Sequence, residues 1–251
     1  AGVTKAELAA YLDMAADRMG PHLYGRPVSL VRAPDGVGKQ TFFQKHAMKG
    51  MPKEIKLVAI TESDGKAEDY LTLPDATAIV SCAQISALEF HVWGSRNDDL
   101  EHPDRMVFDL DPDEELDFEF VKRAAFDIKA LLESADLPSY AMLTGGKGVH
   151  IVLNLKRKHS FEEIKGFSGD VAEQIERLDP KRFVANMAKA RRKGRIFVDY
   201  LRNGRGATAI APYSPRARGM APVAVPVTWR ELKTIPSASV LGNQVLIGAG
   251  G

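Results

Sequence analysis

The alternation of apolar and polar positions along the chain predicts a mixture of helices and strands. The pattern predicts long helices over residues 4–19, 75–88, 117–134 and 160–177. Short runs of apolar and β-branched residues predict strands over residues 28–31, 55–60, 89–93, 105–109, 139–143, 149–155, 195–200 and 207–211. Because the two kinds of element alternate regularly, we expect an α/β or α+β fold.

Capping side chains mark where two helices are expected to begin. Thr4 and Glu7 form one capping box, and Thr228 and Glu231 form another. Gly20-Pro21 is expected to end the first helix, because proline and glycine both disfavour its continuation.

The length and composition are those of a globular protein with a sizeable core. The chain has 251 residues, 45% of them hydrophobic, and shows no internal repeat or low-complexity tract. We expect one domain over residues 1–251, or two closely packed lobes. No apolar run approaches the roughly 20 residues of a membrane span, and no secretion signal is evident, so we expect a cytoplasmic protein without a membrane partner. The single Cys82 excludes an intrachain disulfide and is expected to be an ordinary buried residue.

Charge is distributed unevenly, although the net charge is only +1. Residues 109–119 contain seven acidic and no basic residues, whereas residues 181–218 contain eleven basic residues and one acidic residue, Asp199. The basic segment is either a solvated surface with scattered arginines or a contact for phosphate or nucleic acid. Arginine outnumbers lysine there, and its planar fork suits phosphate oxygens, which favours the second interpretation.

Two carboxylates in an apolar strand are the strongest chemical signal. Side chains two apart on a strand share a face, so Asp109 and Asp111 would project together. Hard oxygen ligands of this kind suit Mg²⁺ or Mn²⁺. The alternative is that the pair only ends a strand before a turn at Pro112.

A glycine-rich segment, Thr144 to His150, lies between two predicted strands. Three glycines in four positions let the backbone approach a ligand, while Thr144 offers a hydroxyl group and Lys147 a positive charge. The segment is not a Walker A motif. A glycine-rich hairpin turn remains the alternative for the segment, and a core histidine the alternative for His150.

Asp199 ends an apolar strand inside the basic segment. It is expected either to pair with arginines or to join a metal site. A two-metal site needs about three carboxylates holding ions roughly 3.5–4 Å apart, a number that Asp109, Asp111 and Asp199 supply.

These motifs, in this order, resemble those of the archaeo-eukaryotic primase superfamily. They are most similar to the polymerase domain of bacterial ATP-dependent DNA ligase D, and the similarity covers nearly the whole chain. Five blocks carry the resemblance: Phe42-Phe43-Gln44-Lys45-His46, Leu88-Glu89-Phe90-His91-Val92-Trp93, Val107-Phe108-Asp109-Leu110-Asp111-Pro112, Val198-Asp199-Tyr200-Leu201-Arg202-Asn203 and Ala211-Pro212-Tyr213-Ser214.

The resemblance implies a primase-polymerase core with mostly antiparallel central sheets flanked by helices. It also implies a template-directed nucleotidyltransferase that extends primers and fills gaps in non-homologous end joining, with a preference for ribonucleotides and for Mn²⁺. Mg²⁺ is the alternative ion. The implied metal ligands are Asp109, Asp111 and Asp199. The implied nucleotide-binding residues are Phe43, Lys45, His91, Thr144, Lys147, His150 and Arg216, and the implied nucleic-acid contacts are Lys5, Arg192 and Arg202.

The start of the chain departs from the family pattern. The family's domain usually begins with a further segment, and basic residues of this region help to recognise a downstream 5′-phosphate. In this chain Lys5 matches one of these basic residues. The implied partners are DNA with 5′-phosphorylated ends or gaps, nucleoside triphosphates, the end-binding protein Ku and a ligase domain of the same or another chain. A metal-dependent nuclease or phosphodiesterase and a noncatalytic DNA-end binding module are the rival hypotheses.

Overall fold

The fold is mixed α/β, with two sheets flanked by helices, as expected from the sequence. The computed structural model describes residues 3–240 and 242. The chain divides into two compact units, the first formed by Ala1–Asp99, Thr208–Ala224 and Val240–Gly251, the second by Leu100–Ala207 and Val225–Ser239. The expectation of one domain over residues 1–251 stays a prediction.

The first unit contains an antiparallel sheet with the strand order β11-β5-β1-β4-β3, and β2 pairs with β1. Its strands are β1 (Pro27–Arg32), β2 (Phe42–Gln44), β3 (Lys56–Thr61), β4 (Ala67–Thr72), β5 (Ala87–Trp93) and β11 (Thr208–Ile210). Its helices are α1 (Lys5–Leu23), α2 (Ala76–Ser81) and the short 3₁₀ helix η1 (Cys82–Ile85).

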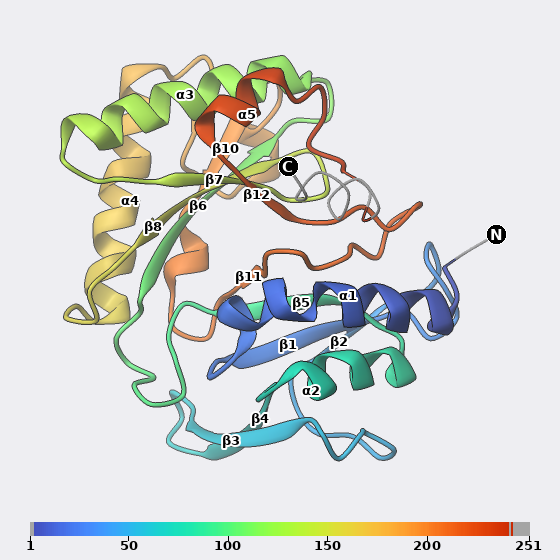
Figure 1. The fold of residues 1–251 in the computed structure, drawn as a ribbon. Coiled ribbons are helices and arrows are strands. Elements are labelled where there is room, and N and C mark those ends of the chain that lie inside the picture. The colour runs from blue at the N-terminus through green and yellow to red at the C-terminus, as the bar shows by residue number, and fades with distance from the viewer. Residues whose placement is uncertain (1–2, 241, 243–251) are drawn as a thin grey trace. The chain divides into compact units, whose positions relative to one another are not determined.

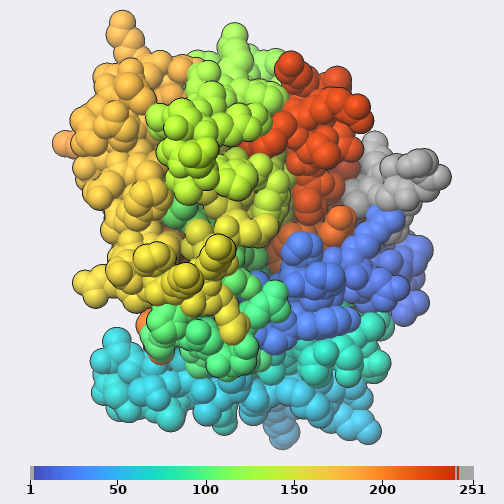
Figure 2. Space-filling model, turned by 60° about the vertical axis from the view of Figure 1, so that its left-hand side comes forward, coloured from blue at the N-terminus to red at the C-terminus, as the bar shows by residue number. Residues whose placement is uncertain are grey.

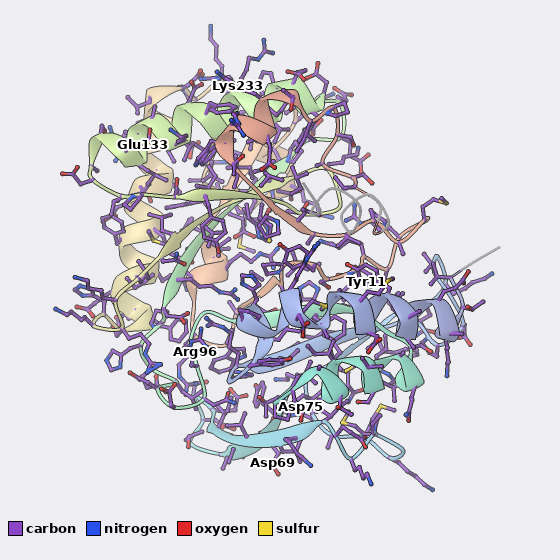
Figure 3. The ribbon with its side chains drawn as sticks, viewed as in Figure 1. Tyr11, Asp69, Asp75, Arg96, Glu133 and Lys233 are labelled. Atoms are coloured by element: carbon purple, nitrogen blue, oxygen red, sulfur yellow. The ribbon has the colours of Figure 1, made fainter. Side chains whose placement is uncertain are left out.

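The helices α1 and α2 lie beside the sheet of this unit (Figure 1), and their apolar side chains are buried in its core. Leu12, Met19 and Leu23 of α1 are fully buried in one cluster with Leu30 and Phe90 of the sheet. Capping sets where the helices begin: the Thr4 box is present on α1, and the side chain of Asp75 accepts the amide of Ala78 on α2. Figure 3 labels Asp75 at this position and Tyr11 on α1, whose hydroxyl donates to the carbonyl of Tyr213.

Two expected helix ends in this unit are wrong. The helix α1 continues through Gly20-Pro21 to Leu23, because Met19 and Leu23 are buried and the amide of Tyr24 still donates to the carbonyl of Gly20. The helix expected over residues 75–88 stops much earlier. Ser86 adopts a left-handed conformation (φ 56°) after η1, and the strand β5 then begins at Ala87.

The second unit contains a sheet with the strand order β12-β7-β8-β6-β10-β9, antiparallel except where β10 meets β9. Its strands are β6 (Arg105–Pro112), β7 (Tyr140–Leu143), β8 (Val149–Asn154), β9 (Phe183–Val184), β10 (Ile196–Asp199) and β12 (Val225–Val227). Its helices are α3 (Phe118–Ser134), α4 (Phe161–Leu178), α5 (Trp229–Thr234) and the short 3₁₀ helices η2 (Lys189–Arg191) and η3 (Leu201–Asn203).

The helices α3 and α4 pack against this sheet through one apolar stripe each. Val121, Ile128 and Leu132 are buried on α3, and Ile164 and Ile175 on α4, at the spacing of a helix that covers a sheet with one side. Their outer sides lie at the surface in the yellow-green to orange part of the space-filling view (Figure 2). The capping box of Thr228 and Glu231 on α5 is confirmed.

The sequence pattern did not predict four short strands, β2, β4, β9 and β12. Three of them have only two or three residues, and β4 reads Ala-Glu-Asp-Tyr-Leu-Thr, with its first three positions exposed. Such segments carry little local signal, because pairing with a neighbouring strand stabilises them.

The environment of Cys82 and the character of the helices bear on two expectations from the sequence. Cys82 is fully buried, as expected, and burial raises the pKa of its thiol. Among the helices of the described part, none combines the length and the apolar character that a membrane crossing requires.

Where β10 ends, the side chain of Asn203 makes the hydrogen bonds to β6 that a neighbouring strand would otherwise make. It accepts the amide of Val107 at 2.8 Å and donates to the carbonyl of Val107 at 2.8 Å. It also donates to the carbonyl of Tyr200 at 3.0 Å. Because Asn203 is only 4% exposed, these bonds connect η3 to the edge of β6 away from water.

We expect Asn203→Ala to lower the free energy of unfolding by about 2–3 kcal/mol, because it leaves buried backbone groups of Val107 without partners. Denaturant unfolding measures this change. The matched control is Asn186→Ala, which removes one side-chain bond in an exposed turn and should cost less than about 1 kcal/mol. Equal effects of the two substitutions would contradict this account of Asn203.

Candidate active site

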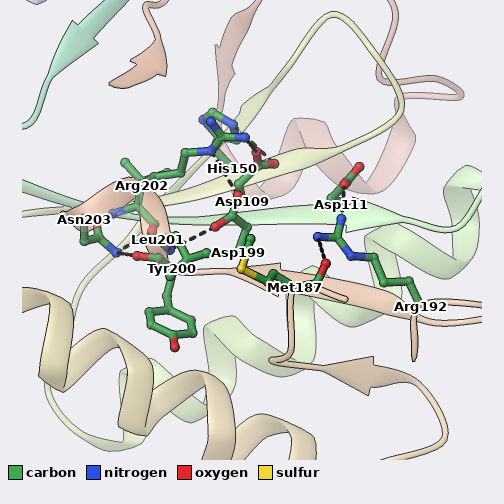
Figure 4. A network of polar contacts seen from close by, with 11 residues as sticks. Asp109, Asp111, His150, Met187, Arg192, Asp199, Tyr200, Leu201, Arg202 and Asn203 are labelled. Carbon is green, nitrogen blue, oxygen red and sulfur yellow. Dashed lines mark hydrogen bonds and ion pairs between the residues drawn. The ribbon is translucent and has the colours of Figure 1, made fainter. Parts of the chain in front are cut away.

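The central strands of the second unit place three predicted site residues in one row. In the antiparallel pairing, Asp109 on β6 stands opposite His150 on β8 and opposite Asp199 on β10. Side chains directly across an antiparallel pair lie on the same face, with Cβ atoms about 4.5–5.5 Å apart. The sheet therefore brings together two carboxylates that are ninety positions apart in the sequence (Figure 4).

Asp111 lies on the same face, two residues beyond Asp109, and is held by an arginine. Its Oδ2 atom is 3.1 Å from Nη1 of Arg192. The guanidinium group of Arg192 also stacks on Phe197, which pairs with Asp111 across the sheet, at 3.8 Å from the ring centroid, and donates to the carbonyl of Met187. The predicted contact residue Arg192 thus lies beside the carboxylates (Figure 4).

Arg202 bridges the other two carboxylates. Its Nε atom is 3.1 Å from Oδ2 of Asp199, and its Nη2 atom is 3.6 Å from Oδ2 of Asp109. The amide of Leu201 donates to Asp199 at 2.9 Å, and Nε2 of His150 is 3.4 Å from Asp109 Oδ1. His150 is buried, as the core alternative expected, yet its ring reaches the carboxylate row.

The carboxylates perturb one another. Loss of water by burial, together with the negative charge of Asp109, raises the pKa of Asp111 above its ordinary value, although Arg192 opposes the shift. Burial likewise raises the pKa of Asp199; Arg202 lowers it, and Asp109 raises it further. Shifts of this kind, produced by burial and like charge, are typical of sites that bind cations or react.

The donor set suits hard divalent cations, because three carboxylates share one sheet face. In the arrangement described for residues 3–240 and 242, however, no group of three or more His, Cys, Asp or Glu side chains is placed to hold one metal ion. Arg192 engages Asp111, while Arg202 engages Asp109 and Asp199. The guanidinium groups offset part of the negative charge of these carboxylates.

The glycine-rich segment forms a tight turn against the end of β6. The carbonyl of Gly148 accepts bonds from the amide of Thr144 at 3.3 Å and from its hydroxyl at 3.0 Å. A Cβ atom at Gly148 would lie 2.5 Å from the backbone oxygen of Leu110 and 3.6 Å from Oδ1 of Asp109. Lys147 is exposed and donates to the carbonyl of Glu114 at 3.3 Å. The turn therefore lies directly beside the carboxylate row.

The first unit brings together three other predicted residues on the face of its sheet opposite the apolar core. Phe43 and Glu89 flank Val31 on opposite sides, and the ring of Phe43 meets that of His91 edge-on at 6.1 Å. Glu89 joins His91 to Arg216. Glu89 is not among the residues predicted from the sequence, although its position two residues before His91 on a strand places both on one face.

Two predicted residues of the first unit lie elsewhere. The ammonium group of Lys45 donates to the hydroxyl of Tyr70 at 3.1 Å and lies 3.9 Å from Glu62. Lys5 donates to the carbonyl of Gln84 at 2.8 Å. Their binding roles stay predictions.

Comparison with known proteins identifies the family. The profile of "LigD, primase-polymerase domain" matches residues 4–246. The chain belongs to this family. The resemblance seen in the sequence is therefore confirmed, together with the fold that it implies.

Individual relatives agree with this assignment. The chain is 40% identical to the multifunctional non-homologous end joining protein LigD of Pseudomonas aeruginosa over 240 residues, which are 94% of this chain and 28% of that protein. It is 35% identical to LigD of Mycolicibacterium smegmatis, over 92% of this chain and 30% of that protein. The chain thus spans less than a third of either relative.

A solved structure also matches. It is the polymerase domain of Mycobacterium tuberculosis ligase D in complex with DNA, with a TM-score of 0.89 and 29% sequence identity. The match covers 98% of this chain and 88% of the other. The similarity therefore extends over nearly the whole primase-polymerase domain.

In this LigD primase-polymerase domain, Gly148→Ala is expected to displace the turn beside Asp109. The new Cβ would collide with a backbone oxygen, which cannot rotate away. We expect a loss of about 2–4 kcal/mol in unfolding free energy, measured by denaturant unfolding. The control is Gly166→Ala on α4, where no atom lies within 4 Å; it should stabilise the helix by up to about 1 kcal/mol. A Gly148→Ala protein as stable as the wild type would refute the close contact.

Asp199→Asn is expected to stabilise the metal-free protein at neutral pH. Because the pKa of Asp199 is raised in the folded state, the folded protein binds a proton there more tightly than the unfolded chain. The ionised group therefore destabilises the fold above the raised pKa, and this effect vanishes as pH falls below the ordinary value of 3.8. With a chelator at pH 7, Tm should rise by about 2 °C, the effect of roughly 1 kcal/mol or less at this length. The difference should shrink as pH approaches 4, and a lower Tm at pH 7 would contradict the sign.

Proposed function

We propose that this domain is a template-directed nucleotidyltransferase that extends primers and fills gaps during non-homologous end joining of broken DNA. Membership in the LigD primase-polymerase family supports the proposal. The single observation that carries it is the row formed by Asp109, Asp199 and His150, with Asp111 and the Gly148 turn adjacent. A nuclease or phosphodiesterase would need similar carboxylates but no loop for a triphosphate.

The reaction is attack of a primer 3′-hydroxyl on the α-phosphate of the nucleotide, with pyrophosphate as the leaving group. Asp109, Asp111 and Asp199 would hold two divalent ions, which when bound supply Lewis-acid stabilisation of the attacking and leaving oxygens. Mn²⁺ is the ion that we propose, and Mg²⁺ the alternative. No side chain acts as the nucleophile.

The remaining residues of the second unit bind and orient. Thr144, Lys147 and His150 are assigned to the triphosphate, where the ammonium of Lys147 and the turn amides offset its charge. Arg192 and Arg202 are assigned to nucleic-acid or nucleotide phosphates, since they already contact the carboxylates around which those phosphates would gather. In the first unit, the nucleotide-binding role of Phe43, Lys45, His91 and Arg216 stays a prediction.

The proposal includes partners and place of action. DNA with a 5′-phosphorylated end or gap is the proposed substrate, and Lys5 a proposed contact. We also propose Ku and a ligase domain as partners, and action in the cytoplasm, where a bacterial chromosome lies. Preference for ribonucleotides belongs to the same proposal and is tested with it.

A gap-filling assay tests the function. The substrate is a duplex with a short gap and a downstream 5′-phosphate, supplied with single ribo- or deoxyribonucleotides and with Mg²⁺, Mn²⁺ or Co²⁺. Templated extension with release of pyrophosphate is expected, strongest with ribonucleotides and Mn²⁺. Equal use of both sugars would refute the preference. Shortening of the primer would instead indicate a nuclease, and salt-sensitive binding without extension under every metal would indicate a noncatalytic module.

Asp109→Asn should reduce extension by more than about 100-fold, because it removes the central carboxylate of the row while keeping its shape. The matched control is Asp127→Asn, which breaks an ion pair with Arg182 on the outside of α3 and should leave extension within about twofold. Single-turnover extension with Mn²⁺ measures both variants. Normal extension by Asp109→Asn would show that the carboxylate assignment is wrong.

A further inference from the structure

Glu89 is a buried carboxylate with a complete set of donors. Its side chain is only 8% exposed. One oxygen accepts a hydrogen bond from Nε2 of His91 at 2.8 Å, and the other accepts from Nε of Arg216 at 3.1 Å and from the amide of Ala217 at 2.9 Å. Burial alone would raise the pKa of Glu89, but the bond from His91 and the charge of Arg216 lower it to about 2. The carboxylate is therefore ionised at neutral pH.

The sheet places Glu89 at the centre of the nucleotide-side residues of the first unit. Glu89 and His91 are two apart on β5 and share the face opposite the apolar core, into which Phe90 between them is fully buried. Phe43 projects on the same face and meets His91 edge-on. Phe43 itself is 60% exposed, so this face retains an accessible aromatic surface beside the buried carboxylate.

Arg216 reaches this face from a segment that is fixed to β5. The hydroxyl of Ser214 accepts the amide of Phe90 at 2.8 Å, and the amide of Ala211 donates to the carbonyl of Phe90 at 2.7 Å. These bonds set the path of the backbone, and Glu89 then sets the direction of the Arg216 side chain. The contact joins residues that are 127 positions apart in the sequence.

Stability alone is a weak explanation for this arrangement. Burying an ion pair costs free energy of desolvation that the attraction between the ions often fails to recover, and apolar residues of similar volume are frequently as stable. A buried carboxylate does, however, fix the geometry of its donors. Its bond to Nε2 sets the imidazole tautomer of His91, and its charge offsets that of Arg216, so that the two side chains can lie close together.

We propose that Glu89 is a positioning residue that holds His91 and Arg216 in a single arrangement for binding the nucleoside triphosphate. The inference rests on the proposed function, since it takes His91 and Arg216 to be nucleotide-binding residues. Glu89 itself need not touch the nucleotide. Its effect is to order two side chains before the nucleotide arrives, so that less conformational freedom is lost on binding.

Glu89→Gln tests the proposal, because it keeps the shape of the side chain but removes the charge and one acceptor. We expect the Kd for a fluorescent ATP analogue with Mn²⁺, and the KM for ATP in gap filling, to rise about tenfold, the effect of losing one charge-assisted hydrogen bond. The kcat value should change by less than about threefold, since the loss falls on binding. The control is Glu101→Gln, which breaks the exposed pair with Arg205 and should leave both constants unchanged.

A mutant cycle that combines Glu89→Gln with substitutions of both of its partners separates positioning from a general structural role. In a protein that already carries His91→Ala and Arg216→Ala, Glu89→Gln should raise the Kd by less than about twofold, because the residues through which it acts are gone. A full tenfold effect in that background, or an unchanged Kd after Glu89→Gln alone, would overturn the proposal. If thermal unfolding shows that Glu89→Gln does not fold, Glu89→Asp replaces it; this variant keeps the charge and should give an intermediate rise in Kd, whereas a wild-type Kd would overturn the proposal.

The wild-type protein separates this inference from the proposed function. If it neither binds the ATP analogue nor extends a primer, the proposed function fails and the inference fails with it. If it does both while Glu89→Gln is indistinguishable from it, only the role of Glu89 is wrong.

Discussion

The pairing of β6 with β10 is the constraint on which the second unit depends, because it sets two carboxylates directly opposite each other. Asp109 and Asp199 occupy one register position on one face, where like charges repel and burial removes the water that would screen them. Arg202 offsets this cost by contacting both, and Arg192 does the same for Asp111. Buried carboxylates that repel one another in this way are typical of functional sites.

The parts around the carboxylates hold the pairing in place. Asn203 continues the hydrogen bonding of β6 beyond the end of β10, so the chain can leave the sheet immediately after Asp199. On the other side of β6, Gly148 lets the turn approach within contact of Leu110 and Asp109. Asn203 and Gly148 each fix the position of the backbone and carry no reactive group, which explains why neither stands out among the chemically reactive residues.

The first unit contains a similar cluster of charges, but there basic side chains outnumber the carboxylate. There a single buried carboxylate, Glu89, accepts hydrogen bonds from two basic side chains and an amide, and these donors lower its pKa although burial alone would raise it. In both units, residues from distant parts of the chain are ordered by hydrogen-bonded charge pairs on one face of a sheet, while the other face packs into an apolar core. In the second unit the carboxylates outnumber the arginines, whereas in the first unit the basic side chains outnumber the carboxylate.

Local features can be predicted from the amino-acid sequence: the mixed fold class, the capping boxes of α1 and α5, the shared face of Asp109 and Asp111, and the order of motifs that identifies the family. These depend on residues within a few positions of one another, where side-chain alternation and capping act directly. The sequence pattern misplaced the end of α1 at Gly20-Pro21 and overlooked β4 and Glu89. Those outcomes depend on burial and on partners distant in sequence. The position of Asp199 opposite Asp109 depends on the folded sheet, because strand register sets which residues meet, and register is fixed by packing across the whole sheet.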